Sequence, residues 1–424
     1  MDPFHSALLF GAFAILLALG VPIAVSIGLS ALFTLGLSLD PGAALTTMAQ
    51  RMATGLDRFT LLAIPFFILS GQLMNRGGIA RRLIDLARAL VGMLPGGLAF
   101  VNVVSGMLFG AISGSAAAAA AAVGGFMVPR MEEQGYDRAF GAAVNIASAT
   151  TSLIIPPSNI LIVYALASGG VSIAALFVAG YIPGLMVGGA LMGVAGIIAF
   201  RRGYPVDERV RPGETLRRAV AAIPSIFLVV LVIGGIVGGI FTPTEAGAIA
   251  VLYSFILSVA VYKEVKWSDI PGLLVEASLM SSIVMLLIAT SMAFSWVLAY
   301  ERIPEAITTA LLSMGGGKIA TLLAINLILL VAGTVLDMTP AVLIFTPMLL
   351  PVAVGLGIDP VQFGIIMVLN LCIGLCTPPV GSVLFLGCSV ARTGIGATSR
   401  ALIPLYAGMI AVLLLETFFG HLWL

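Results

Sequence analysis

Asp337 is the residue whose type and position most directly indicate chemistry, because it is an ionisable side chain inside a long apolar stretch, residues 319–353. A charge within such a stretch is costly, so it is rare unless an ion or a substrate uses it. Thr339 lies two positions further on, and its hydroxyl with the carboxylate forms an oxygen-rich point that suits a hard cation such as Na⁺. Thr339 and Pro340 are expected to be the cap and the first-turn proline of a following helix. In the structural alternative, Asp337 is itself a helix cap near an interface.

A second polar point, Ser113-Gly114-Ser115, interrupts the apolar stretch 97–127 and precedes seven consecutive alanines. The small alanines are expected to let helices pack closely. The two serines are candidates for helix caps, and their oxygens are candidates for cation ligands. Because 97–127 and 319–353 are both too long for one membrane span, each is expected to be a helical hairpin that enters the membrane and turns back at its polar centre.

Two pairs of prolines interrupt apolar stretches, Pro156-Pro157 within 139–165 and Pro378-Pro379 within 361–390. Proline removes a backbone N–H, clashes with the preceding turn and pushes the residue before it out of the helical region. Residues 152–159 and 374–381 are therefore expected to be unwound loops between half-helices. Unwound carbonyls suit Na⁺ and half-helix N-termini suit carboxylates. A single intramembrane proline usually marks a kink, whereas a pair repeated in both halves favours a functional site.

Polar residues concentrate around the first proline pair. Asn145, Ser148, Thr151 and Ser152 recur at spacings of three to four and so largely share a helix face. This face could serve either of two roles, hydrogen bonding between helices or contact with a substrate. The second pair is followed by Val380-Gly381, where the first has Ser158-Asn159. The candidates for substrate contact are Asn145, Ser148, Ser152, Ser158, Asn159 and Gly381.

Composition fixes the class of protein. Of 424 residues, 60% are hydrophobic and only 9% are charged, against about 25% charged in a typical soluble domain, and the mean hydropathy is +1.16. The continuous apolar runs indicate membrane helices rather than the alternating strands of a barrel. The net charge of +1 gives no reason to expect a nucleic-acid partner. No phosphate-binding GxxxxGK[ST] loop, nucleophile–base pair or metal-ligand cluster is visible, so neither an enzyme nor a bound cofactor is expected.

The chain is expected to be an internal duplication, because matching residues recur at a constant offset in the numbering. Pro22 and Pro243 differ in number by 221 (243 − 22), Asp137 and Asp359 differ by 222 (359 − 137), and so do the two proline pairs. We predict a first repeat at 1–200, a basic linker at 201–221 and a second repeat at 222–424. The linker arginines are expected to face the cytoplasm. Five spans and one hairpin per half would invert the second repeat relative to the first.

Several motifs in order resemble a known family. They are Leu61-Leu62-Ala63-Ile64-Pro65-Phe66-Phe67-Ile68-Leu69-Ser70-Gly71, Ser113-Gly114-Ser115-Ala116, Ile155-Pro156-Pro157-Ser158, Phe241-Thr242-Pro243-Thr244-Glu245-Ala246-Gly247 and Thr377-Pro378-Pro379. Together they look like the large membrane subunit of TRAP (tripartite ATP-independent periplasmic) transporters, and the likeness covers essentially the whole chain. By itself, the segment from Thr242 to Glu245 reads as an ordinary capped helix start.

The resemblance implies an all-α membrane protein of the bacterial inner membrane, with two inverted repeats, re-entrant hairpins and broken helices. It implies Na⁺-coupled import of an organic acid by an elevator mechanism, in which a transport domain slides against a scaffold. It also implies a small membrane subunit and a periplasmic substrate-binding protein as partners. The family's cation sites fall on Ser113, Ser115, Thr151 and Ile155 in one half and on Asp337, Thr339 and Thr377 in the other. A stand-alone anion/Na⁺ symporter of the same superfamily is the alternative.

Overall fold

The computed structural model describes residues 3–94, 96–205, 212–313 and 316–423, and within them the chain forms nineteen α-helices and no strand. The all-α prediction is confirmed, as expected for an apolar chain that must satisfy its own backbone hydrogen bonds. Seven helices are long and apolar enough to cross a membrane, or eight if one bent pair counts as a span. More spans were predicted from the sequence. This length criterion omits α1 and α2, which have 16 residues each, and the short half-helices at the proline pairs.

The helices follow one another with short connections. The first half contains α1 (Pro3–Ala18), α2 (Ile23–Ser38), α3 (Pro41–Leu56), α4 (Ala63–Arg76), α5 (Ile79–Val91), α6 (Gly97–Ser113), α7 (Ala116–Glu133), α8 (Arg138–Ala149), α9 (Asn159–Ala167) and α10 (Ile173–Arg201). The second half contains α11 (Pro212–Val237), α12 (Pro243–Phe255), α13 (Ile270–Tyr300), α14 (Ile303–Ser313), α15 (Gly317–Val335), α16 (Met338–Gly355), α17 (Pro360–Leu375), α18 (Ser382–Ala391) and α19 (Ile395–Phe419).

Helix starts recur at the offset that predicted the duplication. The first residues of α7 and α16 differ in number by 222 (338 − 116), and the same offset relates α8 to α17 and α10 to α19. The halves differ clearly at α3 and α4. In the first half, α3 and the segment that contains α4 meet at a 65° bend, whereas the same stretch of the second half is a single helical segment, Trp267–Tyr300.

Three helices, α3, α5 and α14, were not predicted, because a search for apolar stretches overlooks amphipathic segments. The α5 helix carries Arg81, Arg82, Asp85 and Arg88. The predicted linker also differs: α11 begins at Pro212, so Arg217 and Arg218 are helical. Arg209 and Arg211 lie outside the described residues.

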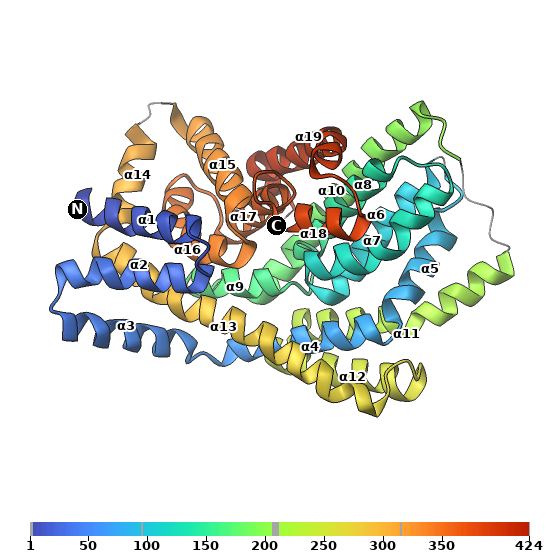
Figure 1. Ribbon diagram of the computed structural model, residues 1–424, viewed down its shortest axis with the longest axis horizontal. Coiled ribbons are helices and arrows are strands. Elements are labelled where there is room, and N and C mark those ends of the chain that lie inside the picture. Colours follow the sequence, from blue (N-terminus) through green and yellow to red (C-terminus); the bar gives the residue numbers. More distant parts are fainter. Residues whose placement is uncertain (1–2, 95, 206–211, 314–315, 424) are drawn as a thin grey trace.

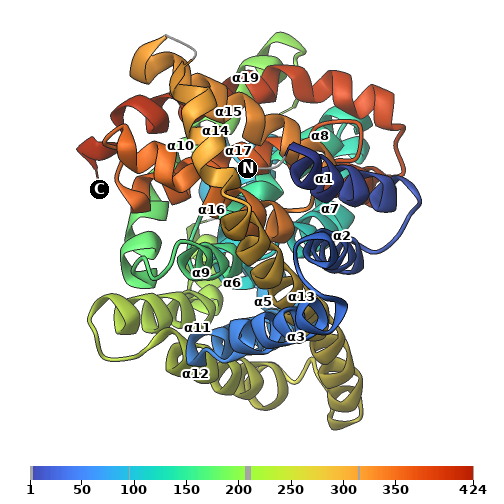
Figure 2. The same cartoon turned by 90° about the vertical axis from the view of Figure 1, so that its left-hand side faces the viewer.

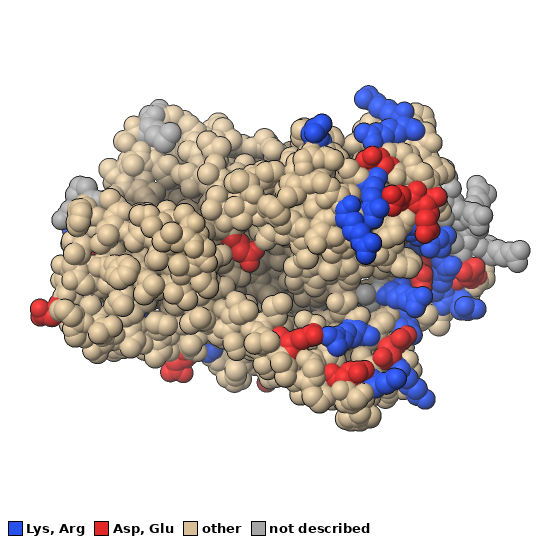
Figure 3. Space-filling model, viewed as in Figure 1, with Lys and Arg blue, Asp and Glu red and all other residues tan. Residues whose placement is uncertain are grey.

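The helices are arranged on two opposite sides of the molecule, with a few helices between them. In both Figure 1 and Figure 2, α3, α11, α12 and α13 lie on one side of the molecule and α15, α17 and α19 on the opposite side. Helices α6, α7 and α9 lie between them. On the face shown in Figure 3, basic side chains gather at the right-hand end, where α10 ends and α11 begins, and the opposite end shows few charges. This distribution is the one that the positive-inside rule associates with a cytoplasmic end.

Close backbone approach joins each hairpin arm to a broken helix. A methyl group at Gly110 of α6 would lie 2.5 Å from Ser152 Cβ and 2.9 Å from its backbone nitrogen, and one at Gly374 of α17 would lie 2.5 Å from the Gly333 backbone. Real side chains do not tolerate these distances, so glycine is required for the contact. The hairpin arms are therefore packed directly against the segments that contain the proline pairs.

Candidate functional site

The first hairpin turns at Ser113–Ser115. Helix α6 ends at Ser113, Gly114 adopts the left-handed conformation (φ +57°), and Ser115 begins α7 as its N-cap. Ser115 Oγ accepts the N–H of Ala118 at 3.3 Å, and Ser115 N–H donates to Ser113 Oγ at 3.4 Å. The predicted cap is confirmed for Ser115. Its hydroxyl oxygen is engaged with its own helix.

The second hairpin turns at Asp337, which is the N-cap residue of α16 but makes no capping hydrogen bond. A cap usually accepts from the second or third helical N–H. The third helical residue here is Pro340, which has no N–H, whereas the first hairpin has Ala118 at that position. The prediction that Thr339 caps this helix is wrong. Asp337 instead accepts a 3.0 Å hydrogen bond from Ser382 Oγ, and it remains exposed.

The first proline pair lies in an unwound and fully buried segment. Helix α8 ends at Ala149, a 3₁₀ turn covers Thr150–Leu153, and α9 begins at Asn159. The hydroxyls here donate to nearby carbonyls: Thr151 to Ser148 at 2.6 Å, Ser152 to Ala149 at 2.5 Å, Ser148 to Asn145 at 3.0 Å, and Ser158 to Leu153 at 2.6 Å. These bonds satisfy part of the backbone that the prolines release.

Two further contacts hold this segment in place. Asn145 donates to the Ala120 carbonyl at 2.9 Å, while its own Oδ1 has no partner. The Ile155 side chain packs against α10, where a methyl at Gly184 would lie 2.5 Å from Ile155 Cγ1. Asn145 thus ties the broken helix to the first hairpin, which is the inter-helix bonding considered for this face.

The second proline pair is unwound as predicted, between the end of α17 at Leu375 and the start of α18 at Ser382. Thr377 Oγ1 donates to the Ile373 carbonyl at 2.7 Å. A methyl at Gly381 would lie 2.7 Å from the Leu375 carbonyl oxygen, so only glycine fits this turn. Unlike the first pair, Pro378, Pro379 and Val380 are exposed. Both proline–proline bonds are cis.

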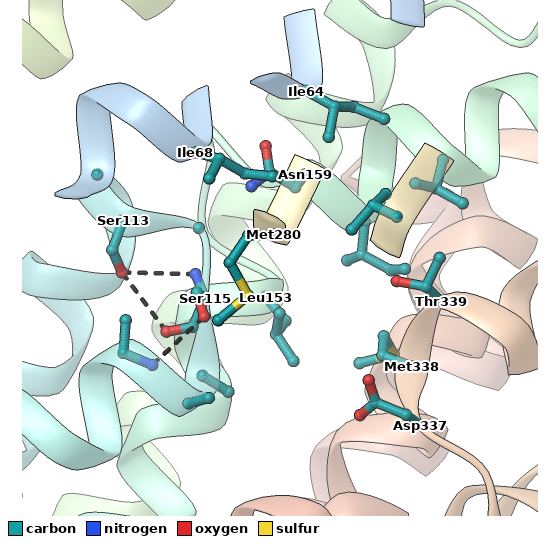
Figure 4. Close-up of a pocket in the computed structure, with 18 of the residues that line it drawn as sticks. Ile64, Ile68, Ser113, Ser115, Leu153, Asn159, Met280, Asp337, Met338 and Thr339 are labelled. Atoms are coloured by element: carbon teal, nitrogen blue, oxygen red, sulfur yellow. Dashed lines mark hydrogen bonds between the residues drawn. The ribbon is translucent and has the colours of Figure 1, made fainter. Parts of the chain in front are cut away.

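A cavity of about 520 Å³ lies between the two hairpin tips. Figure 4 shows Ser113 and Ser115 on one side of it and Asp337 and Thr339 on the other. Asn159, the first residue of α9, also lines it. The remaining predicted residues lie outside this lining: Asn145, Ser148, Thr151, Ser152, Ile155, Ser158, Thr377 and Gly381. Of these, Thr377 borders a separate pocket of about 260 Å³ with Thr334 and Tyr406.

The cavity also has walls that the sequence analysis did not single out. Helix α4 contributes Gln72 and Asn75, and α18 contributes Ser382. Helix α13 contributes an apolar stripe at helical spacing: Met280, Ile283, Val284 and Leu287. The amides of α4 lie three positions apart at the end of an otherwise apolar span, and that spacing was the available signal for them. The stripe on α13 cannot be told from a lipid-facing one by sequence.

The charge that lines this cavity is negative. Asp337 is the one charged side chain among the residues that line it, and the other polar groups are hydroxyls and amides. No group of three His, Cys, Asp or Glu that could hold a metal occurs in the described residues. The cavity thus offers hard oxygen ligands and a negative charge, which suit a small cation, beside neutral donors that suit a polar solute.

Comparison with known proteins gives a consistent assignment. The family model described as the DctM component of the tripartite ATP-independent periplasmic transporter matches residues 10–422. YgiK of Salmonella typhimurium is 54% identical over 98% of this chain and 95% of its own length. The C4-dicarboxylate TRAP transporter large permease protein DctM of Pseudomonas aeruginosa is 42% identical over 93% of this chain and 91% of its own.

A longer relative and two solved structures add to this. The isethionate TRAP transporter permease protein DctMQ of Oleidesulfovibrio alaskensis is 42% identical over 97% of this chain, which spans 64% of that protein. The YdaH transporter of Alcanivorax borkumensis matches with a TM-score of 0.63 at 15% identity, covering 91% of this chain and 89% of that one. MtrF of Neisseria gonorrhoeae has the same TM-score at 14% identity, covering 90% and 85%. At these identities the two structures inform on fold alone.

Proposed function

Because this chain belongs to the DctM component family of tripartite ATP-independent periplasmic transporters, we propose that it imports an organic acid across the bacterial inner membrane in symport with Na⁺. The observation that carries the proposal is the cavity at which both hairpin tips meet. Its one charged lining residue is Asp337, and no intramolecular cation pairs with it in the described residues. A cation bound there would neutralise a charge that otherwise opposes an anionic substrate.

We assign the coupling ion to the two tips. In the first half the ligands are oxygens of Ser113 and Ser115 with the backbone of Thr151 and Ile155 behind them. In the second half they are Asp337 and Thr339 with Thr377. The support for the second site is stronger, because the Asp337 carboxylate has a single neutral donor and lies open to the cavity.

The substrate is placed between the tips, against Asn159 and the N-terminus of α9. The other five predicted substrate-contact residues, Asn145, Ser148, Ser152, Ser158 and Gly381, are buried and act by fixing the backbone of the two breaks. Relatives carry names for C4-dicarboxylate, isethionate, sialic acid and 2,3-diketo-L-gulonate. All are organic acids, so an acid group is the feature we expect the substrate of this chain to share with them.

The partners follow from the family. We propose a small membrane subunit and a periplasmic substrate-binding protein, and movement of the hairpins and broken helices as one body against the remaining helices. The substrate is then captured first outside the membrane. This places selection on the binding protein, and it explains why the cavity needs no arginine for the acid group.

Reconstitution tests the proposal. Proteoliposomes containing this chain with its two partners should take up one of four labelled acids (succinate, isethionate, N-acetylneuraminate or 2,3-diketo-L-gulonate) when a Na⁺ gradient is imposed. Replacing the gradient with K⁺ should abolish uptake. Full uptake by this chain alone would favour the stand-alone symporter, and uptake that is indifferent to Na⁺ would overturn the symport.

A further inference from the structure

A buried carboxylate lies far along the chain from the cavity residues and takes no part in the cavity. Glu416 of α19 is 1% exposed, the lowest exposure of any charged residue in the described chain. Its Oε2 accepts one hydrogen bond, from Trp423 Nε1 at 2.9 Å, and its Oε1 has no partner. A charged carboxylate in an apolar interior requires a cation or several donors, and Glu416 has one neutral donor.

No neighbouring charge compensates it. Helix α19 packs against α8, α10, α17, α18 and its own C-terminal turn. Apart from thiols and phenols, the charged or ionisable side chains in these elements and at their caps are Asp137, Arg138, Arg201, Arg202, Asp359, Arg392, Arg400 and His421. Within the described residues, Glu416 forms an ion pair with none of them. The thiols and phenols on these helices form no hydrogen bond to it.

The carboxylate borders a polar cluster that joins three helices, and the cluster is bonded to the backbone of Glu416 and to the side chain of Thr417. Gln362 of α17 donates to the Glu416 carbonyl at 2.8 Å. The next residue, Thr417, accepts from Asn326 of α15 at 3.1 Å, and Asn326 accepts from Asn370 of α17 at 2.7 Å. A methyl at Gly420 would lie 2.6 Å from Glu416 Oε1 and 2.8 Å from Gln362 Nε2. The free oxygen and the amide therefore border the same small space.

Packing alone does not require polar residues here. At the repeat offset of 222 (416 − 194), the first-half counterparts are Val194 for Glu416, Val104 for Asn326 and Phe140 for Gln362. Asn370 alone has a polar counterpart, Ser148. The equivalent helices of the first half thus carry mostly apolar side chains where the second half has a carboxyl-containing cluster.

We propose that Glu416 is a proton-binding site, which holds a proton at the Oε1 side of its carboxyl and ties α19 to the hairpin arm α15 and the broken helix α17. Protonation removes the uncompensated charge and leaves the Trp423 and Gln362 hydrogen bonds intact. The neighbouring cluster includes residues of α15 and α17, the two helices that position Asp337 and the second proline pair. Proton release there loosens their packing against α19.

Infrared spectroscopy and thermal unfolding of the purified full chain test the proposal. Near neutral pH the wild type should show the C=O band of a protonated carboxyl. Glu416→Gln should remove this band. Glu301→Gln is the control and should leave the band in place. Its carboxylate is also buried, but Ser38 and His5 already contact it. The wild-type Tm should fall by about 2 °C or more between about pH 6 and about pH 9, and Glu416→Gln should lose that fall.

The sign follows from proton linkage. The unfolded glutamate releases its proton near pH 4.3. A proton that the proposed site holds only in the folded state therefore makes stability decrease as pH rises above that value. Trp423→Phe removes the one donor to the carboxylate, so the band should persist to higher pH. That variant decides the matter even if Glu416→Gln fails to fold. Three results would each overturn the proton site. The wild type could lack the band, or Trp423→Phe could leave the pH dependence of the band unchanged. The third is that Na⁺, and not a proton, stabilises the chain through Glu416.

Discussion

Pro340 distinguishes the second hairpin tip from the first in a way that controls what the Asp337 carboxylate can do. Ser115 and Asp337 occupy equivalent positions, at the repeat offset of 222 (337 − 115), and each begins a returning helix. Ser115 is bound to the N–H of Ala118. The residue at the corresponding position is Pro340, which offers no N–H, so Asp337 is released from capping. A proline in the first turn thus leaves a carboxylate available for a ligand.

Replacing that proline should convert the site into a cap. Pro340→Ala restores an N–H at the third position after Asp337, and the carboxylate should then accept from it. We expect α16 to gain about 0.5–1 kcal/mol in the absence of Na⁺ and the half-saturating Na⁺ concentration to rise several-fold. Thermal unfolding at increasing Na⁺ measures both. Pro347→Ala, in the same helix but away from the tip, should not change the Na⁺ response; an equal change there would mean that the effect is not capping.

The contact between the first hairpin and the first break depends on Gly110. Gly110→Ala would place a methyl 2.5 Å from Ser152 Cβ, so we expect a loss of about 1–3 kcal/mol although alanine is the better helix former. Gly189→Ala in α10, where nothing lies within 4 Å of the added methyl, is the control and should be neutral or stabilising. Comparable Tm values for the two variants would contradict the packing described here.

Some residues of the candidate site were predictable from the sequence and others were not. Ser115 and Asp337 were predictable because polar residues stand out within apolar stretches. Asp337 as the cap of α16 was the structural alternative, whereas Thr339 was the predicted cap, because a threonine before a proline is typical of a helix start; the structure places that proline at the third helical position. The spacing of Gln72 and Asn75 was a signal for a shared face, but that this face and Ser382 line the cavity depends on the tertiary packing of α4 and α18.

At the scale of elements, apolar stretches and proline pairs correctly predicted the broken helices. The same patterns did not predict the amphipathic helices. The capped start of α12 was read correctly: Thr242 accepts the N–H of Glu245 at 3.3 Å, and the Glu245 carboxylate accepts the N–H of Thr242 at 2.8 Å. The burial of one proline pair and the exposure of the other were not predictable. The first pair packs against α10, where a methyl at Gly180 would lie 3.5 Å from Pro156 Cδ and one at Gly184 would lie 2.5 Å from Ile155 Cγ1, and sequence patterns do not indicate such tertiary contacts.

The capping box at the start of α12 predicts a mutation that changes stability and leaves the Na⁺ response unchanged. Thr242→Ala removes one half of the box and should lower the free energy of unfolding by about 1 kcal/mol. Because α12 contributes no residue to the cavity lining, the Na⁺ dependence of the remaining folded protein should be unchanged. Thermal unfolding in Na⁺ and in K⁺ separates the two effects. A changed Na⁺ response would connect α12 to the ion site and contradict this assignment.

At the scale of the whole molecule, transport by the proposed mechanism requires the hairpins to move past the other helices. Gly71 of α4 meets the first tip, and a methyl there would lie 3.5 Å from Ser113 Cα, close enough for a disulfide between cysteines at the two positions. We expect Gly71→Cys with Ser113→Cys to cross-link and to lose the uptake that the same variant shows when kept reduced, a reference that already includes the loss of the Ser113 oxygen. The native cysteines are buried and should not interfere. Undiminished uptake by the fully cross-linked protein would contradict relative movement at this contact.

The central claim is that the cavity between the tips binds the coupling cation through Asp337, and Na⁺-dependent thermal stabilisation of the purified chain tests it most directly. Wild-type Tm should rise with Na⁺ and not with K⁺ at equal ionic strength. Asp337→Asn keeps the shape of the side chain and removes its charge, so the half-saturating Na⁺ concentration should increase about tenfold or more, about 1.4 kcal/mol. An unchanged Na⁺ titration in Asp337→Asn would contradict the account.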